Sequence, residues 1–192
     1  MQHPAVLQTF EMDGRTIRLQ YMTPADGPAL MGFARSVPRH DLLFLRTDIT
    51  TTEGVAEWVE GVAQGQTGVI LAYDGDRLVG FSSVARTPTP WQRHIAELSV
   101  VVGPEARHHG FGLRLTEEAF RAAEDMAVIR MLARMTLDQA GAIELFRSLG
   151  FVPLAILADQ VIDQDGKRYD LLMMHQDIER FAATLKHLDE VN

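Results

Sequence analysis

The residues best suited to chemistry lie in one short stretch, Arg107-His108-His109-Gly110-Phe111-Gly112. An apolar run precedes this stretch and a helical pattern follows it, so its glycines open a helix directly after a strand. Backbone N–H groups at the start of a helix lack partners and carry partial positive charge, which suits phosphate oxygens. Arg107 adds a charge-assisted contact. The stretch therefore predicts an anion site that fits a pyrophosphate.

Two common nucleotide motifs do not fit this spacing. The dinucleotide fingerprint requires a third glycine where this chain has Leu115, and the P-loop requires a Lys-Ser/Thr pair that is absent. A NAD- or ATP-binding loop is therefore disfavoured. The remaining alternative is a glycine turn that serves only the packing of a helix on a strand.

A second candidate is Glu97, which interrupts the apolar run from Ile95 to Val102. In an alternating strand Glu97 shares a face with Ser99 and Val101, and apolar surroundings make a carboxylate a better base. The alternative is that Glu97 pairs with a nearby arginine or lies at a solvated strand end. No metal site is expected, because His108 and His109 are adjacent and lack the spacing of zinc ligands.

Hydrophobic periodicity and turn residues predict the elements that position these residues. The expected order is strand 16–21, a helix from Thr23-Pro24, a helix with a Thr50/Glu53 capping box, strands 68–73 and 78–85 around Asp74-Gly75-Asp76, strand 95–102, helix 110–126, strand 128–137, a helix from Asp138 to Leu149, a hairpin of 151–161 and 167–174, and a terminal amphipathic helix. This order is typical of a mixed α/β or α+β sheet.

Composition excludes several classes of protein. The 192 residues suit one domain with a terminal extension, and 46% hydrophobic residues are enough for a core. The chain has no cysteine, which excludes disulfides and a cysteine nucleophile. A net charge of −8 disfavours nucleic acid as a partner, and no apolar run approaches the roughly 20 residues of a membrane span. A cytoplasmic protein is expected.

The chain resembles the GNAT superfamily of N-acetyltransferases, whose acetyl-CoA loop reads Gln/Arg-x-x-Gly-x-Gly/Ala and matches Arg107 to Gly112 throughout. The resemblance extends back to Ala96 and forward to the Leu149-Gly150-Phe151 ending of the late helix. Some members, including bacterial protein-lysine acetyltransferases, are similar in placing a glutamate on the strand that carries Glu97 here. The resemblance implies an α/β (α+β) fold: a mixed, mostly antiparallel sheet flanked by helices, with a splayed strand pair.

The same resemblance implies the cofactor and its contacts. Acetyl-CoA is the expected cosubstrate, with Glu97 as the catalytic base. The residues expected to contact acetyl-CoA are Leu98, Val100, Val102, Arg107, His108, His109, Gly110, Phe111, Gly112, Leu113, Asp138 and Phe146. The chain departs from the family at two of these positions, because Phe146 replaces the usual tyrosine acid and Asp138 replaces an asparagine.

The resemblance divides the chain into an N-terminal extension (1–14), the GNAT domain (15–176) and a C-terminal amphipathic helix (177–192). The helix packs either on the domain or on a second copy in a homodimer. The expected reaction is direct acetyl transfer to a primary amine of a small molecule or a protein lysine. Because Phe146 cannot donate a proton, a catalytically weak acyl-CoA sensor or scaffold is the alternative. Phe33, Phe44, Trp58 and Trp91 either line the acceptor pocket or belong to the core.

Overall fold

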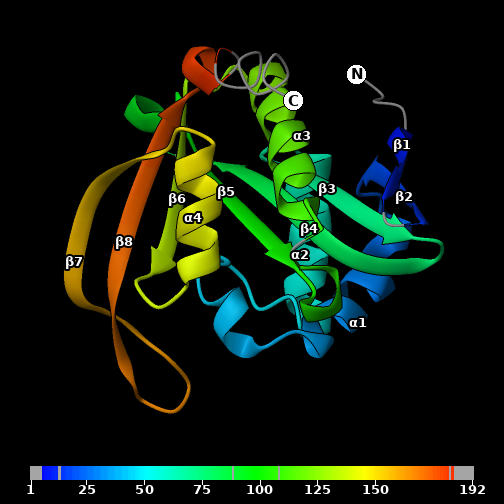
Figure 1. Cartoon of the computed structure of the whole chain (residues 1–192), viewed down its shortest axis with the longest axis horizontal. Coiled ribbons are helices and arrows are strands. Elements are labelled where there is room, and N and C mark those ends of the chain that lie inside the picture. Colours follow the sequence, from blue (N-terminus) through cyan, green and yellow to red (C-terminus); the bar gives the residue numbers. More distant parts are fainter. Residues whose placement is uncertain (1–5, 13, 88, 108, 182, 184–192) are drawn as a thin grey trace. The chain divides into compact units, whose positions relative to one another are not determined.

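The computed structural model describes residues 6–12, 14–87, 89–107, 109–181 and 183 (Figure 1). The chain forms two compact units. The first contains residues 1–85 and 99–119, and the second contains residues 86–98 and 120–192. Strand β5 (Ile95–Val102) and helix α3 (Phe111–Asp125) contribute residues to both units. None of the helices in the described ranges is long and apolar enough to span a membrane.

The first unit is built on antiparallel strands that follow the order β1-β2-β3-β4 and continue to β5. These strands are β1 (Val6–Met12), β2 (Arg15–Tyr21), β3 (Thr67–Asp74) and β4 (Arg77–Arg86). The predicted hairpin between β3 and β4 is confirmed, because Asp74 pairs with Arg77 across the Gly75-Asp76 turn. Gly75 has a φ of 59°, a left-handed conformation that glycine adopts without strain.

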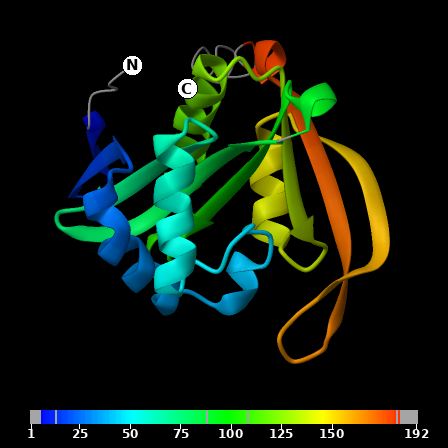
Figure 2. The ribbon, with the colours of Figure 1, turned by 180° about the vertical axis from the view of Figure 1, so that it is seen from behind.

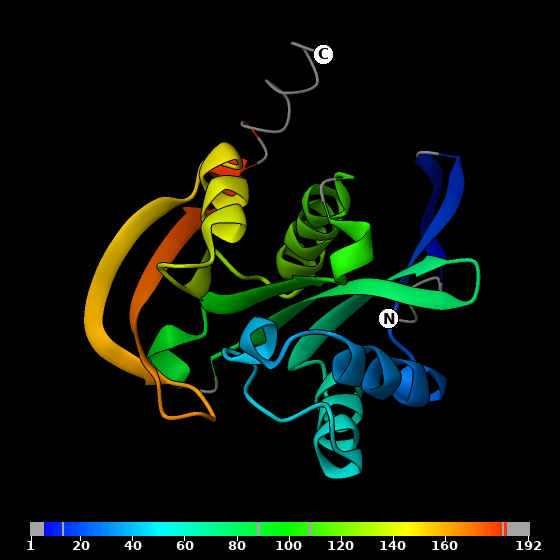
Figure 3. The same ribbon diagram turned by 60° about the horizontal axis from the view of Figure 1, so that its bottom comes forward.

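Helices cover the two faces of these strands (Figures 2 and 3). Helix α1 (Gly27–Ser36) and helix α2 (Thr52–Ala63) lie on one face, and the first half of α3 lies on the other. Residues alternate between the faces along β4. The Phe81 ring meets Phe33 and Trp58 on the α1/α2 face, whereas Ser82 Oγ donates to the Leu115 carbonyl of α3.

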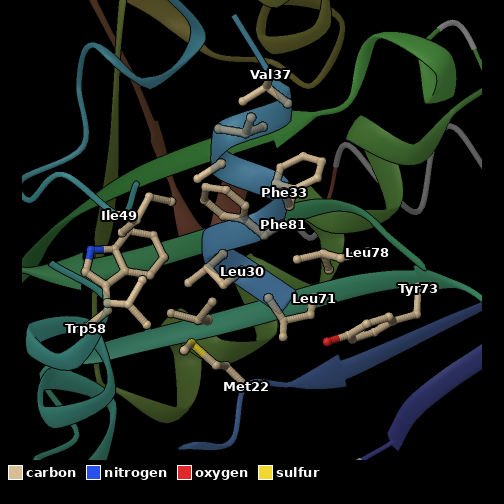
Figure 4. Packing of buried hydrophobic residues seen from close by; sticks show 14 residues of the cluster. Met22, Leu30, Phe33, Val37, Ile49, Trp58, Leu71, Tyr73, Leu78 and Phe81 are labelled. Carbon is tan, nitrogen blue, oxygen red and sulfur yellow. The ribbon is translucent and has the colours of Figure 1, made fainter. Parts of the chain in front are cut away.

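The core on the α1/α2 face gathers side chains from both helices and from β3, β4 and β5 (Figure 4). Phe81 is fully buried, and its ring centroid lies 5.9 Å from that of Phe33 and 5.5 Å from that of Trp58, both edge to face. Phe33 and Trp58 are therefore core residues, which decides between the two roles that the sequence left open for them.

The second unit contains strands in the order β5-β6-β8-β7. Strand β6 (Arg130–Thr136) runs parallel to β5, with pairs from Ile95↔Arg130 to Leu98↔Ala133, and antiparallel to β8 (Arg168–Asp177). Strand β7 (Val152–Ile162) forms the predicted hairpin with β8, seen as the long pair of arrows in Figure 1. Helix α4 (Ala140–Ser148) ends before Leu149, whose carbonyl accepts from Gln176 of β8.

Three features of the fold differ from the sequence prediction or exceed it. Strand β1 was not predicted, although Met12 pairs with Arg15 across an Asp13-Gly14 sequence like the one that marked the β3–β4 turn. The N-cap of α2 is Thr51, not Thr50, because the Thr51 hydroxyl accepts from the Gly54 N–H. The predicted terminal helix begins at Ile178, and most of it lies outside the described residues.

Candidate functional site

The turn that leads from β5 into α3 lies in the first unit. Gly103 follows β5 and donates its N–H to the Val79 carbonyl at 2.9 Å, which fixes the end of the strand against β4. A short 3-10 helix (Pro104–Ala106) then brings the chain to Arg107. Ala106 is buried, whereas Arg107, His109 and Gly110 are exposed, so the turn presents its later residues to solvent.

Gly110 gives this turn its geometry. Its φ of 79° lies in the left-handed region, and its carbonyl accepts from the Arg114 N–H at 3.2 Å, the first helical bond of this turn. The N–H groups of Phe111, Gly112 and Leu113 precede that bond, so they have no acceptor within the helix. Three adjacent amides therefore face the same end of the helix.

Close packing holds the first half of α3 against the strands. A Cβ on Gly80 would lie 2.9 Å from the Val101 carbonyl oxygen and 3.2 Å from Leu115 Cδ1, so only glycine fits there without a shift. Phe111 and Leu115 are buried beneath the turn. Gly80 is not among the residues predicted from the sequence, where its signal is a glycine inside a strand, which often marks close backbone approach.

The Arg107 side chain connects the turn to two other segments of the first unit. Its Nε donates to the Val102 carbonyl at 3.1 Å, and its Nη2 forms an ion pair of 2.5 Å with Asp41 Oδ2. The guanidinium therefore joins the end of β5 to the start of the turn and to the 3-10 helix Arg39–Leu42. Sequence reasoning assigned Arg107 to phosphate and did not foresee Asp41, which precedes it by 66 residues.

Glu97 lies in the second unit, on the part of β5 that pairs with β6. Its Oε2 accepts from Arg134 Nη2 at 2.9 Å, and the Glu97 side chain is 25% exposed. The wholly apolar setting expected for Glu97 is therefore wrong, because the side chain of Arg134 reaches it from the neighbouring strand. The pairing with an arginine, which the sequence analysis held as the alternative, is present.

A second pair of the same kind lies on β6. Arg130, four residues before Arg134, forms two hydrogen bonds with Asp177 of β8, at 2.6 and 3.3 Å. The hydrogen bond from Arg130, with its positive charge, lowers the pKa of Asp177 from its usual value, while partial burial opposes this shift. Asp177 is thus a second carboxylate that pairs with an arginine of β6, and it serves as a comparison for Glu97.

Two further predicted contact residues belong to the second unit. Asp138 is exposed, and the N-cap position of α4 is Gln139, whose side-chain carbonyl accepts from the Thr136 N–H at 3.0 Å. The capping prediction is therefore wrong by one residue. Phe146 is 5% exposed and packs edge to face on Phe151, with ring centroids 4.9 Å apart, so its role in the core is confirmed.

The remaining predicted residues fall into three groups. Leu98 is buried, whereas Val100 and Val102 are half-buried on β5. His108 lies outside the described residues, and the ring of His109 approaches that of Phe111. Trp91 is 78% exposed, which places it outside the core. Within the described ranges, no group of three or more histidine, aspartate or glutamate side chains is arranged to hold a metal ion.

Comparison with known proteins decides the family. The model of the acetyltransferase (GNAT) family matches residues 33–151, which is more than half of the chain. The chain belongs to the GNAT family. The matched range includes Glu97 and the whole stretch from Arg107 to Gly112, so the resemblance seen in the sequence is confirmed. This GNAT protein is an N-acetyltransferase that uses acetyl-CoA.

Individual relatives support the same assignment. The GNAT protein is 25% identical over 140 residues to the putative phosphinothricin acetyltransferase YwnH of Bacillus subtilis, covering 69% of this chain and 81% of YwnH. Its fold is similar to that of yncA, a putative acetyltransferase of Salmonella typhimurium solved with acetyl-CoA, with a TM-score of 0.73, 22% identity and coverage of 84% and 94%. The fold is also similar to that of the ribosomal-protein-alanine N-acetyltransferase of Brucella melitensis, with a TM-score of 0.71 and 28% sequence identity. This match covers 83% of this chain and 98% of the other.

These likenesses confirm the predicted fold class, an α+β arrangement with a mixed, mostly antiparallel sheet and flanking helices. The splay of a strand pair and the division of the chain at residues 14 and 176 stay predictions. The individual contact residues also stay predictions.

Proposed function

We propose that this enzyme transfers the acetyl group of acetyl-CoA directly to a primary amine, on a small molecule or on a protein lysine. The observation that carries the proposal is the turn at Gly110, where a left-handed glycine and three adjacent helix-terminal amides create a cradle for an anion. Acetyl-CoA supplies the thioester that is cleaved. The chain's own residues bind the cosubstrate and move the proton.

The pyrophosphate of acetyl-CoA suits the turn for two reasons. The amides of His109 to Leu113 donate hydrogen bonds without needing a particular side chain, and the dipole of α3 adds partial positive charge at the same end. The fit requires room above the turn, and among the described residues a Cβ on Gly110 would meet only Met12 Cε, at 3.6 Å. His108 belongs to the same predicted contact set.

The pantetheine arm is proposed to pair with the backbone of β5, as an added strand does in β-augmentation. The predicted residues are Leu98, Val100 and Val102. One detail sharpens this proposal: the Val102 carbonyl already accepts from Arg107 Nε. The Val102 N–H is therefore the group better suited to pantetheine. Contacts from Asp138 and Phe146 are proposed on the family resemblance alone.

Glu97 is proposed as the base that takes the proton from the acceptor ammonium. Direct transfer requires a neutral amine, because the protonated form has no lone pair to attack the thioester carbonyl. Glu97 lies on the same strand as Val100 and Val102. Arg134 holds Oε2, so the carboxylate has a fixed orientation in which it accepts the proton, directly or through a water molecule.

The departing thiolate has no tyrosine to protonate it at the position of Phe146, which is buried against Phe151. A thiol with a pKa of about 8.5 leaves as a thiolate near neutral pH at modest cost. We therefore propose unassisted departure or protonation by water.

The acceptor is tested by measuring CoA release with a panel of amines. The names of two relatives, a putative phosphinothricin acetyltransferase and a ribosomal-protein-alanine N-acetyltransferase, place both small molecules and protein amino groups in the panel. Polyamines, aminoglycosides, amino acids and lysine peptides complete it. We expect one class to raise CoA release well above the rate without acceptor. If no amine class does so while acetyl-CoA binds, the proposed acceptor chemistry is wrong.

A further inference from the structure

Asp41 is distant in sequence from the proposed acetyl-CoA turn and pairs with its Arg107. It lies in the 3-10 helix Arg39–Leu42, on the segment that joins α1 to α2. The Asp41–Arg107 pair measures 2.5 Å between Oδ2 and Nη2, and the two side chains are 22% and 40% exposed. Because the carboxylate is partly buried, dissolved salt screens this ion pair less than it screens a pair of fully exposed charges.

The segment that carries Asp41 is itself held in place. The Asp41 N–H donates to the Pro38 carbonyl, and Leu42 and Leu45 pack against the core of the first unit. Farther along, Arg39 Nη1 lies 3.2 Å from Asp48 Oδ1 and 2.9 Å from Thr50 Oγ1. The carboxylate of Asp41 is therefore held at a fixed position beside Arg107.

Arg107 has two constraints at once. The Val102 carbonyl fixes Nε and Asp41 fixes Nη2, so the planar guanidinium has a defined orientation across the turn. Arg107 is only three residues before Gly110, whose left-handed φ of 79° precedes the start of α3. Loss of either constraint frees a long side chain and the turn that follows it.

We propose that Asp41 is a positioning residue for acetyl-CoA, acting through Arg107 on the pyrophosphate turn. The segment between α1 and α2 therefore helps to determine the affinity for acetyl-CoA. This inference rests on the proposed role of the turn from Arg107 to Leu113. Asp41 itself touches no reacting atom and takes no part in the proton transfer.

The test compares three variants of the full chain. Asp41→Asn keeps the shape and removes the charge, Asp41→Glu restores the charge, and Asp48→Asn removes a carboxylate from the same segment that pairs with Arg39 instead. We expect Asp41→Asn to raise the Kd for CoA, measured by calorimetry, and the KM for acetyl-CoA about fivefold. Its kcat at saturating acetyl-CoA should stay within about twofold. Asp41→Glu should recover most of the affinity. Asp48→Asn loosens the same segment but leaves the Asp41–Arg107 pair, so it should weaken CoA binding much less than Asp41→Asn does.

A truncated donor separates positioning from general damage to the fold. Acetyl-pantetheine lacks the pyrophosphate, so Asp41→Asn should leave its KM unchanged. Arg107→Gln should weaken CoA binding, and adding Asp41→Asn to it should cause little further loss. The inference is overturned if Asp41→Asn binds CoA like the parent, if Asp48→Asn is equally weakened, or if the loss persists with acetyl-pantetheine.

Failure of the turn assignment gives a different pattern. Gly112→Val would then bind CoA normally, whatever Asp41→Asn does. If Gly112→Val loses binding and Asp41→Asn keeps it, the turn assignment stands and only the role of Asp41 falls.

Discussion

The acetyl-CoA turn and the Glu97–Arg134 pair do their proposed work with different parts of the chain. In the turn the functional groups are backbone amides, set by a glycine at a φ of 79° and a tightly packed helix start. At Glu97 the functional group is a side chain, oriented by an arginine from the next strand. A backbone site should be sensitive to an added Cβ, and a side-chain site to a single lost charge.

The largest expected effect is on catalysis by Glu97. Glu97→Gln keeps the shape of the side chain and removes the base, so we expect kcat to fall by about 10²- to 10⁴-fold while the Kd for CoA changes little. The residual rate should rise with pH toward the pKa of the acceptor amine, because only the neutral amine then reacts. Steady-state rates with a saturating acceptor over a pH series measure both effects.

Asp177→Asn is the matched control, since Asp177 also pairs with an arginine of β6. It should keep kcat within about twofold. Near-parental kcat in Glu97→Gln would show that water or another group takes the proton. An equal loss in both variants would assign the effect to the strand pairing instead.

The backbone site makes a prediction about stability. Gly110→Ala forces a left-handed φ on a residue with a Cβ, and we expect it to lower the free energy of unfolding by about 1–3 kcal/mol. Gly141→Ala is the control: Gly141 lies in α4 with an ordinary φ, and no atom of the described residues lies within 4 Å of the added carbon, so this change should stabilise by about 0.5–1 kcal/mol. Urea unfolding measures both. Equal effects of the two changes would contradict the strained-turn explanation.

The smallest predicted effect concerns pH and the Arg130–Asp177 pair. The folded pKa of Asp177 lies below its unfolded value of about 3.9, so the pair stabilises the fold fully above that value. This stabilisation is lost as the pH falls through the folded pKa. Asp177→Asn should therefore be less stable than the parent at pH 7, by at most about 1 kcal/mol because Arg130 is 41% exposed. The difference in stability between parent and variant should shrink below pH ~4, which thermal unfolding at several pH values measures. A difference that stays constant with pH would contradict this explanation.

Local signals explain which parts of the fold and site were predictable. The β3–β4 hairpin, β5 and α3 were predicted because an Asp-Gly turn, an apolar run and a helical period are each visible within a few residues. Strand β1 carried the same Asp-Gly signal at residues 13–14, but its mixed pattern did not alternate clearly. Thr50 and Thr51 are both plausible caps by type, and only the contact with Gly54 selects Thr51.

Partners distant in the sequence could not be predicted. Arg134 follows Glu97 by 37 residues, and Asp41 precedes Arg107 by 66. Neither pairing has a spacing signature, because each depends on how strands and helices pack. The site could thus be located from its glycine motif, whereas the surroundings of its charged side chains required the structure.

Binding of acetyl-CoA by Gly112→Val, measured by calorimetry beside the parent, tests the central claim most directly. In the parent, acetyl-CoA at 100 times its Kd should stabilise the fold by about 2.7 kcal/mol, and NADH and ATP should give no comparable shift. A β-branched side chain at Gly112 should block the approach of the pyrophosphate to the helix start, so a folded Gly112→Val should show no measurable binding. Undiminished affinity in that variant would place acetyl-CoA elsewhere on the molecule and contradict the assignment of the turn.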